Sequence, residues 1–203
     1  MKITLKNALP ALLVISLTLG CSILDRIKKQ ADAGKTTQVV TSTDNKSQLT
    51  VPGSWDKSMN LNKEASLQAG NMMAGQYTIV ISESKAGFGA DVTLDKFTQA
   101  ARDAATANFM VSDMVLGESR SVTINGYPAM QFEARGSAAN QKLVWIYTTI
   151  DAPRNYHQVI AWTLASNLEQ NKPILLDVAN SFKEIDDGSG PDSAPPPPPG
   201  KKK

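Results

Sequence analysis

The sequence predicts an α+β domain, in which antiparallel strands form a sheet and helices pack on it. Three observations support this class: an Asn125-Gly126 hairpin signal, two long strands with apolar residues on both faces, and two segments with apolar residues at helical spacing. Strands paired through short turns and helices that each bury one face are typical of a layered α+β fold.

The first part of the predicted domain contains short strands. Residues 47–52 form a candidate strand that a proline-glycine pair ends, and residues 76–82 form a second with alternating β-branched residues. Residues 65–69 are a further candidate. The glycine-rich stretch 87–90 has neither a lysine nor a GxGxxG spacing, so it is expected to be a loop and not a phosphate site.

A helix is predicted next, with Asp91 or Thr93 as its N-cap and its end near Asn108. Apolar residues recur along it every three or four positions, and several of them are alanines. This face is expected to pack closely on the sheet.

The clearest hairpin follows this helix. Strands 119–124 and 127–134 flank Asn125-Gly126, a pair that tolerates the positive φ angles of a type I′ turn. Two longer strands come next, at 142–150 and 156–165, and both carry apolar residues on both faces. Such strands are expected at the centre of a sheet that is covered on both sides.

A last helix is predicted to start near Pro173, because proline suits the first helical position. Residues 188–203 contain five consecutive prolines and three lysines, a composition that forms no core. The prolines favour a polyproline II rod. Three interpretations remain open: a ligand for a partner, a spacer that places the lysines on an anionic surface, or a plain disordered tail.

Charge divides the chain into three parts. Residues 22–46 contain five basic and three acidic side chains, residues 188–203 contain three and one, and residues 47–187 contain 11 and 15. A nucleic-acid domain would instead gather lysine and arginine on the folded part, so the pattern argues against nucleic acid as a partner. Basic flanks suit an anionic membrane.

The N-terminal stretch indicates export. Lys2 and Lys6 precede an apolar run at residues 8–19, which is too short to span a bilayer and is typical of a cleaved signal peptide, residues 1–20. The residues that end it, 17–21, are Leu-Thr-Leu-Gly-Cys and resemble the lipobox of bacterial lipoproteins. This resemblance implies a lipid on Cys21; an ordinary signal peptide with a coincidental cysteine is the alternative.

The predicted domain organisation follows from these boundaries. A lipidated tether covers residues 21–46, a globular domain covers 47–187, and the proline- and lysine-rich tail covers 188–203. Ser22 after the cysteine resembles the sorting signal for the outer membrane of Gram-negative bacteria. The expected location is therefore the cell envelope, with the lipid in the outer membrane and the domain facing the periplasm.

The sequence contains little that points to catalysis or to a cofactor. His157 is the only histidine, Cys21 is the only cysteine, and no GxSxG motif accompanies a serine. We therefore expect no catalytic, metal or cofactor site, although a group of carboxylates follows Gly89: Asp91, Asp95, Asp103, Asp113 and Glu118. Capping and solvation explain most of them.

Three apolar residues lie in predicted loops that glycines flank. They are Met72, Met73 and Phe88. Such residues serve as a contact surface for a partner, or they fold back as a lid on the core.

Several packing and turn residues resemble those of one known family. They are Leu49-Thr50-Val51-Pro52 with Trp55, the hairpin Asn125-Gly126-Tyr127-Pro128-Ala129, the aromatic strands at Trp145 and 156–162, and Asn180-Ser181-Phe182. Together they resemble the PsbP-like superfamily, in particular its bacterial DcrB-like lipoprotein branch. The resemblance implies an α/β/α sandwich with a central, largely antiparallel twisted sheet and helices on both faces. It also implies binding to other proteins and no enzymatic activity.

Three hypotheses for function follow. The first is a non-enzymatic, lipid-anchored envelope protein whose domain binds another envelope protein. The second is a carrier that holds a lipid or an apolar small molecule between sheet and helix, although large residues such as Trp145 and Trp162 are expected to fill that space. The third is a hydrolase, which would need a cleft that joins His157 to carboxylates.

Overall fold

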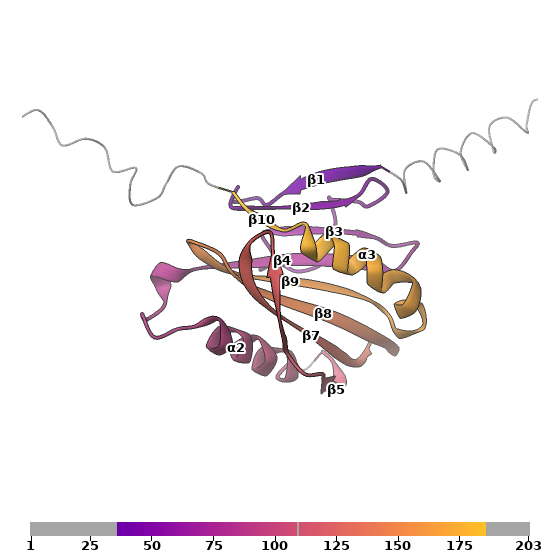
Figure 1. Cartoon of the computed structure of the whole chain (residues 1–203). Coiled ribbons are helices and arrows are strands. Elements are labelled where there is room, and N and C mark those ends of the chain that lie inside the picture. The colour runs from indigo at the N-terminus through magenta and orange to yellow at the C-terminus, as the bar shows by residue number, and fades with distance from the viewer. Residues whose placement is uncertain (1–35, 109, 186–203) are drawn as a thin grey trace, which may run out of the picture.

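The computed structural model describes residues 36–108 and 110–185, which form two sheets and two α-helices (Figure 1). The strands are β1 (Thr37–Thr41), β2 (Ser47–Pro52), β3 (Leu67–Asn71), β4 (Gln76–Ser84), β5 (Ser112–Leu116), β6 (Arg120–Ile124), β7 (Tyr127–Ala138), β8 (Gln141–Asp151), β9 (Asn155–Leu164) and β10 (Lys183–Glu184). The helices are α2 (Leu94–Thr106) and α3 (Leu168–Asn180), with short 3-10 turns η1 (Lys85–Gly87) and η2 (Ala165–Asn167).

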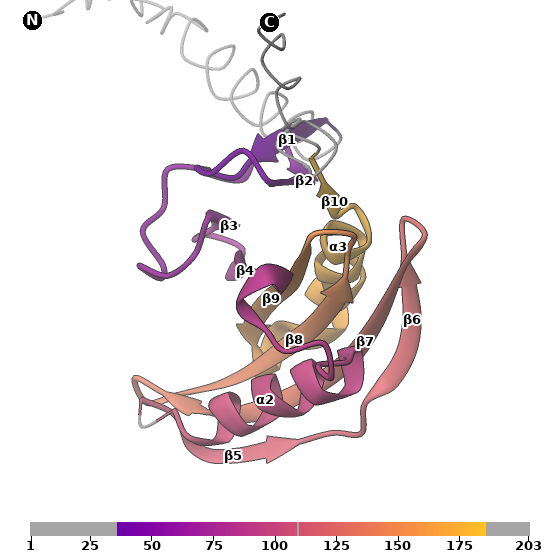
Figure 2. The same cartoon turned by 90° about the vertical axis from the view of Figure 1, so that its left-hand side faces the viewer.

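The larger sheet has seven strands in the order β3-β4-β9-β8-β7-β5, and β6 pairs with β7 beside this path. Every pairing in it is antiparallel. Helix α2 lies on one face, whereas α3 and the small sheet β1-β2-β10 lie on the other (Figures 1 and 2). The predicted α+β class, with helices on both faces of an antiparallel sheet, is confirmed.

The two central strands supply side chains to both layers. Along β8, Ile146 and Ile150 pack in the cluster on the α3 side, whereas Trp145 and Tyr147 pack in the cluster on the α2 side. Successive side chains of a strand point to opposite faces, so a strand covered on both sides must be apolar on both. The prediction that these two strands are central is confirmed.

The Asn125-Gly126 hairpin joins β6 to β7. Both residues have positive φ angles, 48° at Asn125 and 88° at Gly126, as a type I′ turn requires. The Asn125 side chain also donates hydrogen bonds to the carbonyl oxygens of Phe182, at 2.6 Å, and Asn180, at 3.1 Å. The turn therefore also holds the chain that follows α3.

Helix α2 has the predicted cap, but α3 begins earlier than predicted. The Thr93 hydroxyl accepts a hydrogen bond from the Lys96 amide, and Phe97, Ala101 and Ala105 are buried beneath the helix. Helix α3 starts at Leu168, so the start predicted near Pro173 is wrong. Proline has no backbone N–H, so the hydrogen bond from residue 173 to the Glu169 carbonyl is missing from the helix. Glu169 is exposed, so water can bind this carbonyl instead.

The folded part begins earlier than the predicted boundary at Ser47. Strand β1 pairs with β2, with Val40 opposite Leu49, and Val40 is buried. The tether prediction is therefore wrong for residues 37–46, whose β-branched residues contribute a strand to the small sheet. The predictions for the signal peptide, Cys21, residues 22–35 and the tail 188–203 lie outside the described residues.

Candidate functional site

A groove lies between α2 and the larger sheet. Helix α2 packs over β7 and β8 and leaves more of β4 and β9 uncovered on the same face. The space has a volume of about 620 Å³ and is bounded by α2, by residues 61–64 and by the sheet.

The floor of this groove is aromatic and apolar. Tyr77 on β4, Trp162 on β9 and Trp145 on β8 are directly opposite one another in the register. The rings of Tyr77 and Trp162 stack, with centroids 5.4 Å apart and planes inclined by 20°. The next row along the strands is Ile79, Ile160 and Tyr147. A ligand in the groove would therefore rest on two rows of large side chains.

The groove continues past Trp162 into a second hollow of about 580 Å³. The two parts share Leu61 and Trp162 as lining residues, and we refer to them together as the α2 groove. Met72 and Met73, in the turn between β3 and β4, line its far end and are 74% and 92% exposed. The α2 groove thus follows β4 along its length.

The two walls of the α2 groove are formed in different ways. On the helix side the lining residues are small: Ala101, Ala104 and Ala105. On the other side, the Gln68 side-chain oxygen accepts hydrogen bonds from the amides of Leu61, at 2.6 Å, and Asn62, at 3.1 Å. Short side chains leave the space open, and this pair of hydrogen bonds holds the opposite wall in place.

The electrostatic character of the α2 groove is weakly acidic. Among the described residues that line it, the charged ones are Glu64 and Glu83. Burial raises the pKa of the Tyr147 phenol, so this floor residue is uncharged at neutral pH. A basic or neutral apolar ligand is favoured over an anionic one.

The three residues predicted as a contact surface, Met72, Met73 and Phe88, do not lie together in the structure. Met72 and Met73 lie together at one end of β4, whereas Phe88 follows η1 at the other end. The Phe88 ring packs edge-on against Phe97, at 6.2 Å between centroids, and against Tyr156, at 5.8 Å. Phe88 thus covers the start of α2, as in the lid interpretation, and only the methionines line the α2 groove.

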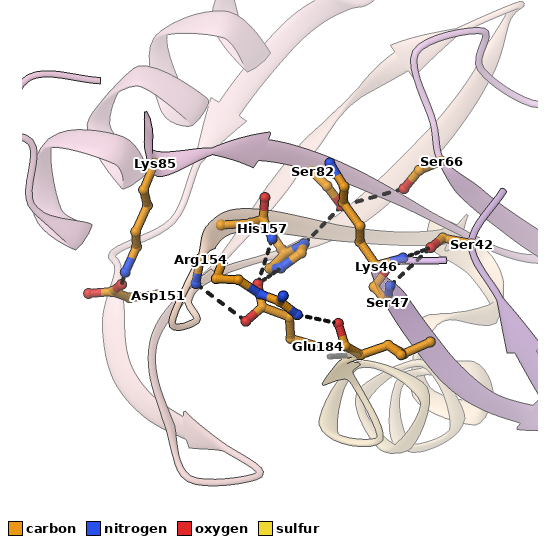
Figure 3. A network of polar contacts seen from close by, with 12 residues as sticks. Ser42, Lys46, Ser47, Ser66, Ser82, Lys85, Asp151, Arg154, His157 and Glu184 are labelled. Carbon is orange, nitrogen blue, oxygen red and sulfur yellow. Dashed lines mark hydrogen bonds and ion pairs between the residues drawn. The ribbon is translucent and has the colours of Figure 1, made fainter. Parts of the chain in front are cut away.

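His157 lies in a polar network on the other face of the sheet (Figure 3). Its Nδ1 is 2.8 Å from the Ser82 hydroxyl, and its Nε2 is 3.3 Å from a carboxylate oxygen of Glu184 on β10. The Asn155 amide donates to the same oxygen at 2.6 Å. Because a carboxylate only accepts, Nε2 carries a hydrogen and His157 donates to Glu184.

Burial at this network is nearly complete. The His157 side chain is 0% exposed and that of Glu184 is 5% exposed. Burial raises the pKa of the Glu184 carboxyl, but hydrogen bonds from His157, Asn155 and the Arg154 amide outweigh it, so the pKa lies below its ordinary value. The carboxylate therefore stays ionised and ties β10 to the sheet.

A hydroxyl, an imidazole and a carboxylate in contact are also the parts of an acyl-transfer triad. Here the imidazole packs against Phe182, with ring centroids 4.6 Å apart, and neither His157 nor Glu184 lines the α2 groove. The network joins strands, and within the described part of the chain its imidazole is fully buried. Sequence reasoning singled out His157 but missed both partners, since Ser82 and Glu184 are far from it in the chain.

The predicted carboxylate group is not assembled into a site. Asp91 pairs with Lys96 at 2.7 Å, and Asp103 accepts a hydrogen bond from Gln99 on the surface of α2. Within residues 36–108 and 110–185, no group of three or more His, Cys, Asp or Glu side chains is placed to hold a metal ion.

Comparison with known proteins shows the fold. No protein-family model matches the chain, and no curated protein matches it. Among solved structures, the cyanobacterial PsbP protein CyanoP from Synechocystis has a TM-score of 0.52 and 13% identity, over 74% of this chain and 93% of its own. LpqN, involved in cell envelope biogenesis of Mycobacterium tuberculosis, has a TM-score of 0.54 and 14% identity, over 76% and 96%. At these identities the likeness shows a PsbP-like fold.

Neither described helix is long and apolar enough to cross a membrane.

Proposed function

We propose that this protein is a non-enzymatic, lipid-anchored envelope protein that binds a segment of another envelope protein in the α2 groove. The observation that carries the proposal is the groove itself, with its stacked aromatic floor and its exposed methionines. Aromatic residues and methionine are enriched where proteins bind one another, and methionine adapts its shape to different apolar side chains.

The dimensions of the α2 groove favour a polypeptide segment. It follows β4, a strand of nine residues, which spans about 30 Å at the usual rise of a strand. An extended segment of similar length would place alternate side chains on the two rows of large side chains. Glu64 and Glu83 at one end favour a basic residue in the bound segment.

The envelope location rests on the N-terminal stretch and on one structural neighbour. Residues 17–21 resemble a lipobox, which would place a lipid on Cys21 and the domain beside a membrane. LpqN, which has a similar fold, is involved in cell envelope biogenesis. Ser22 supports the outer membrane as the site of the anchor.

The absence of enzymatic activity is proposed from the chemistry of the described side chains. The groove residues with acidic side chains, Glu64 and Glu83, have no histidine beside them in the lining, and His157 is sealed in its own network. General acid–base catalysis by His157 would need its imidazole within reach of a substrate in the groove.

Crosslinking in cells, followed by mass spectrometry, tests the proposal. The full chain is compared with Met73→Asp, which places a charge at the exposed end of the α2 groove, and with Glu169→Asp on the exposed side of α3. We expect a reproducible partner that is lost with Met73→Asp and retained with Glu169→Asp. A partner that is captured equally by both variants would refute the groove as the binding site. Cys21→Ala tests the contribution of the lipid.

A second candidate function is a carrier of a lipid or an apolar small molecule. The specific observation in its favour is a space of about 620 Å³ between sheet and helix, within the range of small-molecule sites. The expectation that Trp145 and Trp162 fill this space is wrong, because both form its floor. Native mass spectrometry of the protein purified from membranes decides between the two: a constant ligand mass supports the carrier, and its absence supports the polypeptide site.

A further inference from the structure

We infer that two copies of this chain pair edge to edge through β1, so that their small sheets join into one continuous sheet across a two-fold axis. The inference goes beyond the proposed function and does not rest on it, since no residue of β1 lines the α2 groove. Three observations carry it: the direction of the backbone groups of β1, the character of the other sheet edges, and the symmetry of the β1 sequence.

One side of β1 is open. Among the described strands, β1 pairs with β2 alone and lies on the far side of the small sheet from β10 (Figure 1). The Thr36 carbonyl accepts a hydrogen bond from the Gly53 amide at 2.7 Å. Six residues later, the Ser42 amide donates to the Ser47 carbonyl at 2.9 Å. Opposed residues of an antiparallel pair are hydrogen-bonded alternately, and the register with β2 is regular between these points. The even-numbered residues of β1 therefore bond to β2, and the odd-numbered ones direct their N–H and C=O groups outward: Thr37, Val39 and Thr41.

The odd-numbered residues of β1 are also exposed at their side chains. Val39 is 55% exposed, whereas its neighbour Val40 is buried in the core. Successive side chains of a strand alternate between the two faces, so the odd-numbered side chains share the outer face of the small sheet. A second strand beside β1 would meet open backbone groups and exposed side chains, and Val40 would stay in the core.

The other edges of the two sheets are protected in ways that β1 is not. The backbones of Asp56 and Gly70 exchange hydrogen bonds at 2.7 and 3.0 Å along the side of β3 that faces away from β4. Strand β5 has a register shift against β7, β6 begins with the charged Arg120, and β10 consists of two charged residues. Charges, bulges and short strands are common means of protecting a sheet edge from other chains. Strand β1 contains no charged residue and no proline, and its register is regular.

The sequence of β1 fits a second copy of itself. It reads Thr-Gln-Val-Val-Thr, with a threonine at each end and Val39 at the centre. A two-fold axis beside Val39 would place this residue opposite its counterpart, and Thr37 opposite Thr41 of the second copy in both directions. Each of these pairs would be of the hydrogen-bonded type, with two backbone bonds, about six bonds in all. Pairs of threonines are favourable neighbours across strands.

The lack of charge on β1 favours a second copy in particular. In a two-fold contact the same surface meets itself, so a charged residue at the axis would lie opposite a like charge, which is destabilising. Five paired residues form a contact smaller than the interface of a stable complex, which buries about 1,600 Å². The dimer is therefore expected to be weak, and crosslinking in cells is the suitable test.

Disulfide formation in cells treated with a mild oxidant tests the pairing and its register in the full chain. In Val39→Cys the two cysteines would have Cα atoms about 5.5 Å apart, within the range that a disulfide spans. We expect this variant to form linked dimers. Thr37→Cys alone should not, because position 37 lies four residues, or about 13 Å along the strand, from its counterpart. Coexpressed with Thr41→Cys, it should link. The unchanged chain measures any link through Cys21.

Charges at position 39 test the symmetry of the contact in the same assay. The link between Thr37→Cys and Thr41→Cys chains should be lost when both also carry Val39→Lys, because two like charges then meet at the axis. It should return when one chain carries Val39→Lys and the other Val39→Glu, which also shows that the single charges leave the fold intact. Val115→Lys in both chains is the matched control, because Val115 is a 64% exposed valine on the edge strand β5; it should leave the link unchanged.

Four results would overturn the inference. They are a Val39→Cys chain that links to itself no more than Thr37→Cys does, a Val39→Cys chain that links to a different protein instead, opposite charges that fail to restore the link, and equal effects of the lysines at positions 39 and 115. None of these results bears on the α2 groove, which the variants at position 73 test separately.

Discussion

Replacement of Glu184 by alanine is expected to destabilise the fold by about 3 kcal/mol. The carboxylate accepts hydrogen bonds from Asn155 at 2.6 Å, from His157 at 3.3 Å and from the Arg154 amide at 3.4 Å, and it is 5% exposed. Hydrogen bonds to charged groups contribute about 1.5 to 3 kcal/mol each, and removal of one partner of a buried pair costs about 3 to 5 kcal/mol. The lower end applies here, because two of these three distances, 3.3 and 3.4 Å, are long for hydrogen bonds to a carboxylate.

Urea denaturation of the full chain in detergent, followed by fluorescence, measures this effect. Glu184→Ala should lower the denaturation midpoint without a change in slope, and should lower the melting temperature by roughly 10 °C. Glu184→Gln keeps an acceptor oxygen and should cost about 1 kcal/mol. Glu169→Ala, on the exposed surface of α3, is the control and should stay within about 0.5 kcal/mol. If Glu184→Ala also stayed within 0.5 kcal/mol, the tie between β10 and the sheet would be refuted.

Three further predictions concern pH, the hairpin and the aromatic cover. The pKa of Glu184 in the folded state lies below its ordinary value of 4.5. Its contribution to the free energy of unfolding is therefore complete above about pH 4.5 and is lost as the pH falls through the folded-state pKa. Denaturation curves between pH 3 and 6 should show a smaller loss of stability at low pH for Glu184→Gln than for the unchanged chain. Gly126→Ala should cost about 1 kcal/mol, because the residue has a φ of 88°, as calorimetry would show. Phe88→Ala should cost about 2 kcal/mol through loss of its contacts with Phe97 and Tyr156, whereas Met73→Ser should leave the urea midpoint unchanged because Met73 is 92% exposed.

The elements that the sequence predicts correctly are those whose own residue pattern matches their burial in the fold. The Asn125-Gly126 pair specifies its turn without help from distant residues. Apolar residues on both faces of β8 and β9 indicate central strands, because a strand in the middle of a sheet that is covered on both sides buries both of its faces.

The elements that sequence reasoning missed depend on distant partners. Strand β1 buries only Val40, and β10 has two residues, so neither has a periodic pattern of its own. Both are strands because β2 lies between them and pairs with each. The start of α3 was predicted from Pro173 alone, although Leu168 is buried one and a half turns earlier.

The candidate site was predicted only in part, since a groove is a property of packing. Met72 and Met73 stand out as apolar residues in a loop that glycines flank, and both line the α2 groove. Trp145 and Trp162 were expected to fill the space beneath the helix, because large side chains usually do so. The alanines of α2 and the hydrogen bonds that hold Leu61 leave the space above them open, and neither effect is visible in the local sequence.

The most direct test of the central proposal places a photoreactive amino acid at position 73 of the full chain in living cells. Position 169, on the exposed surface of α3, carries the same amino acid as the matched control. We predict a discrete adduct with one envelope protein from position 73, with the attachment in a short segment of that protein, and no such adduct from position 169. Adducts that form equally from both positions, or from position 169 alone, would contradict the proposal that the α2 groove is the binding site.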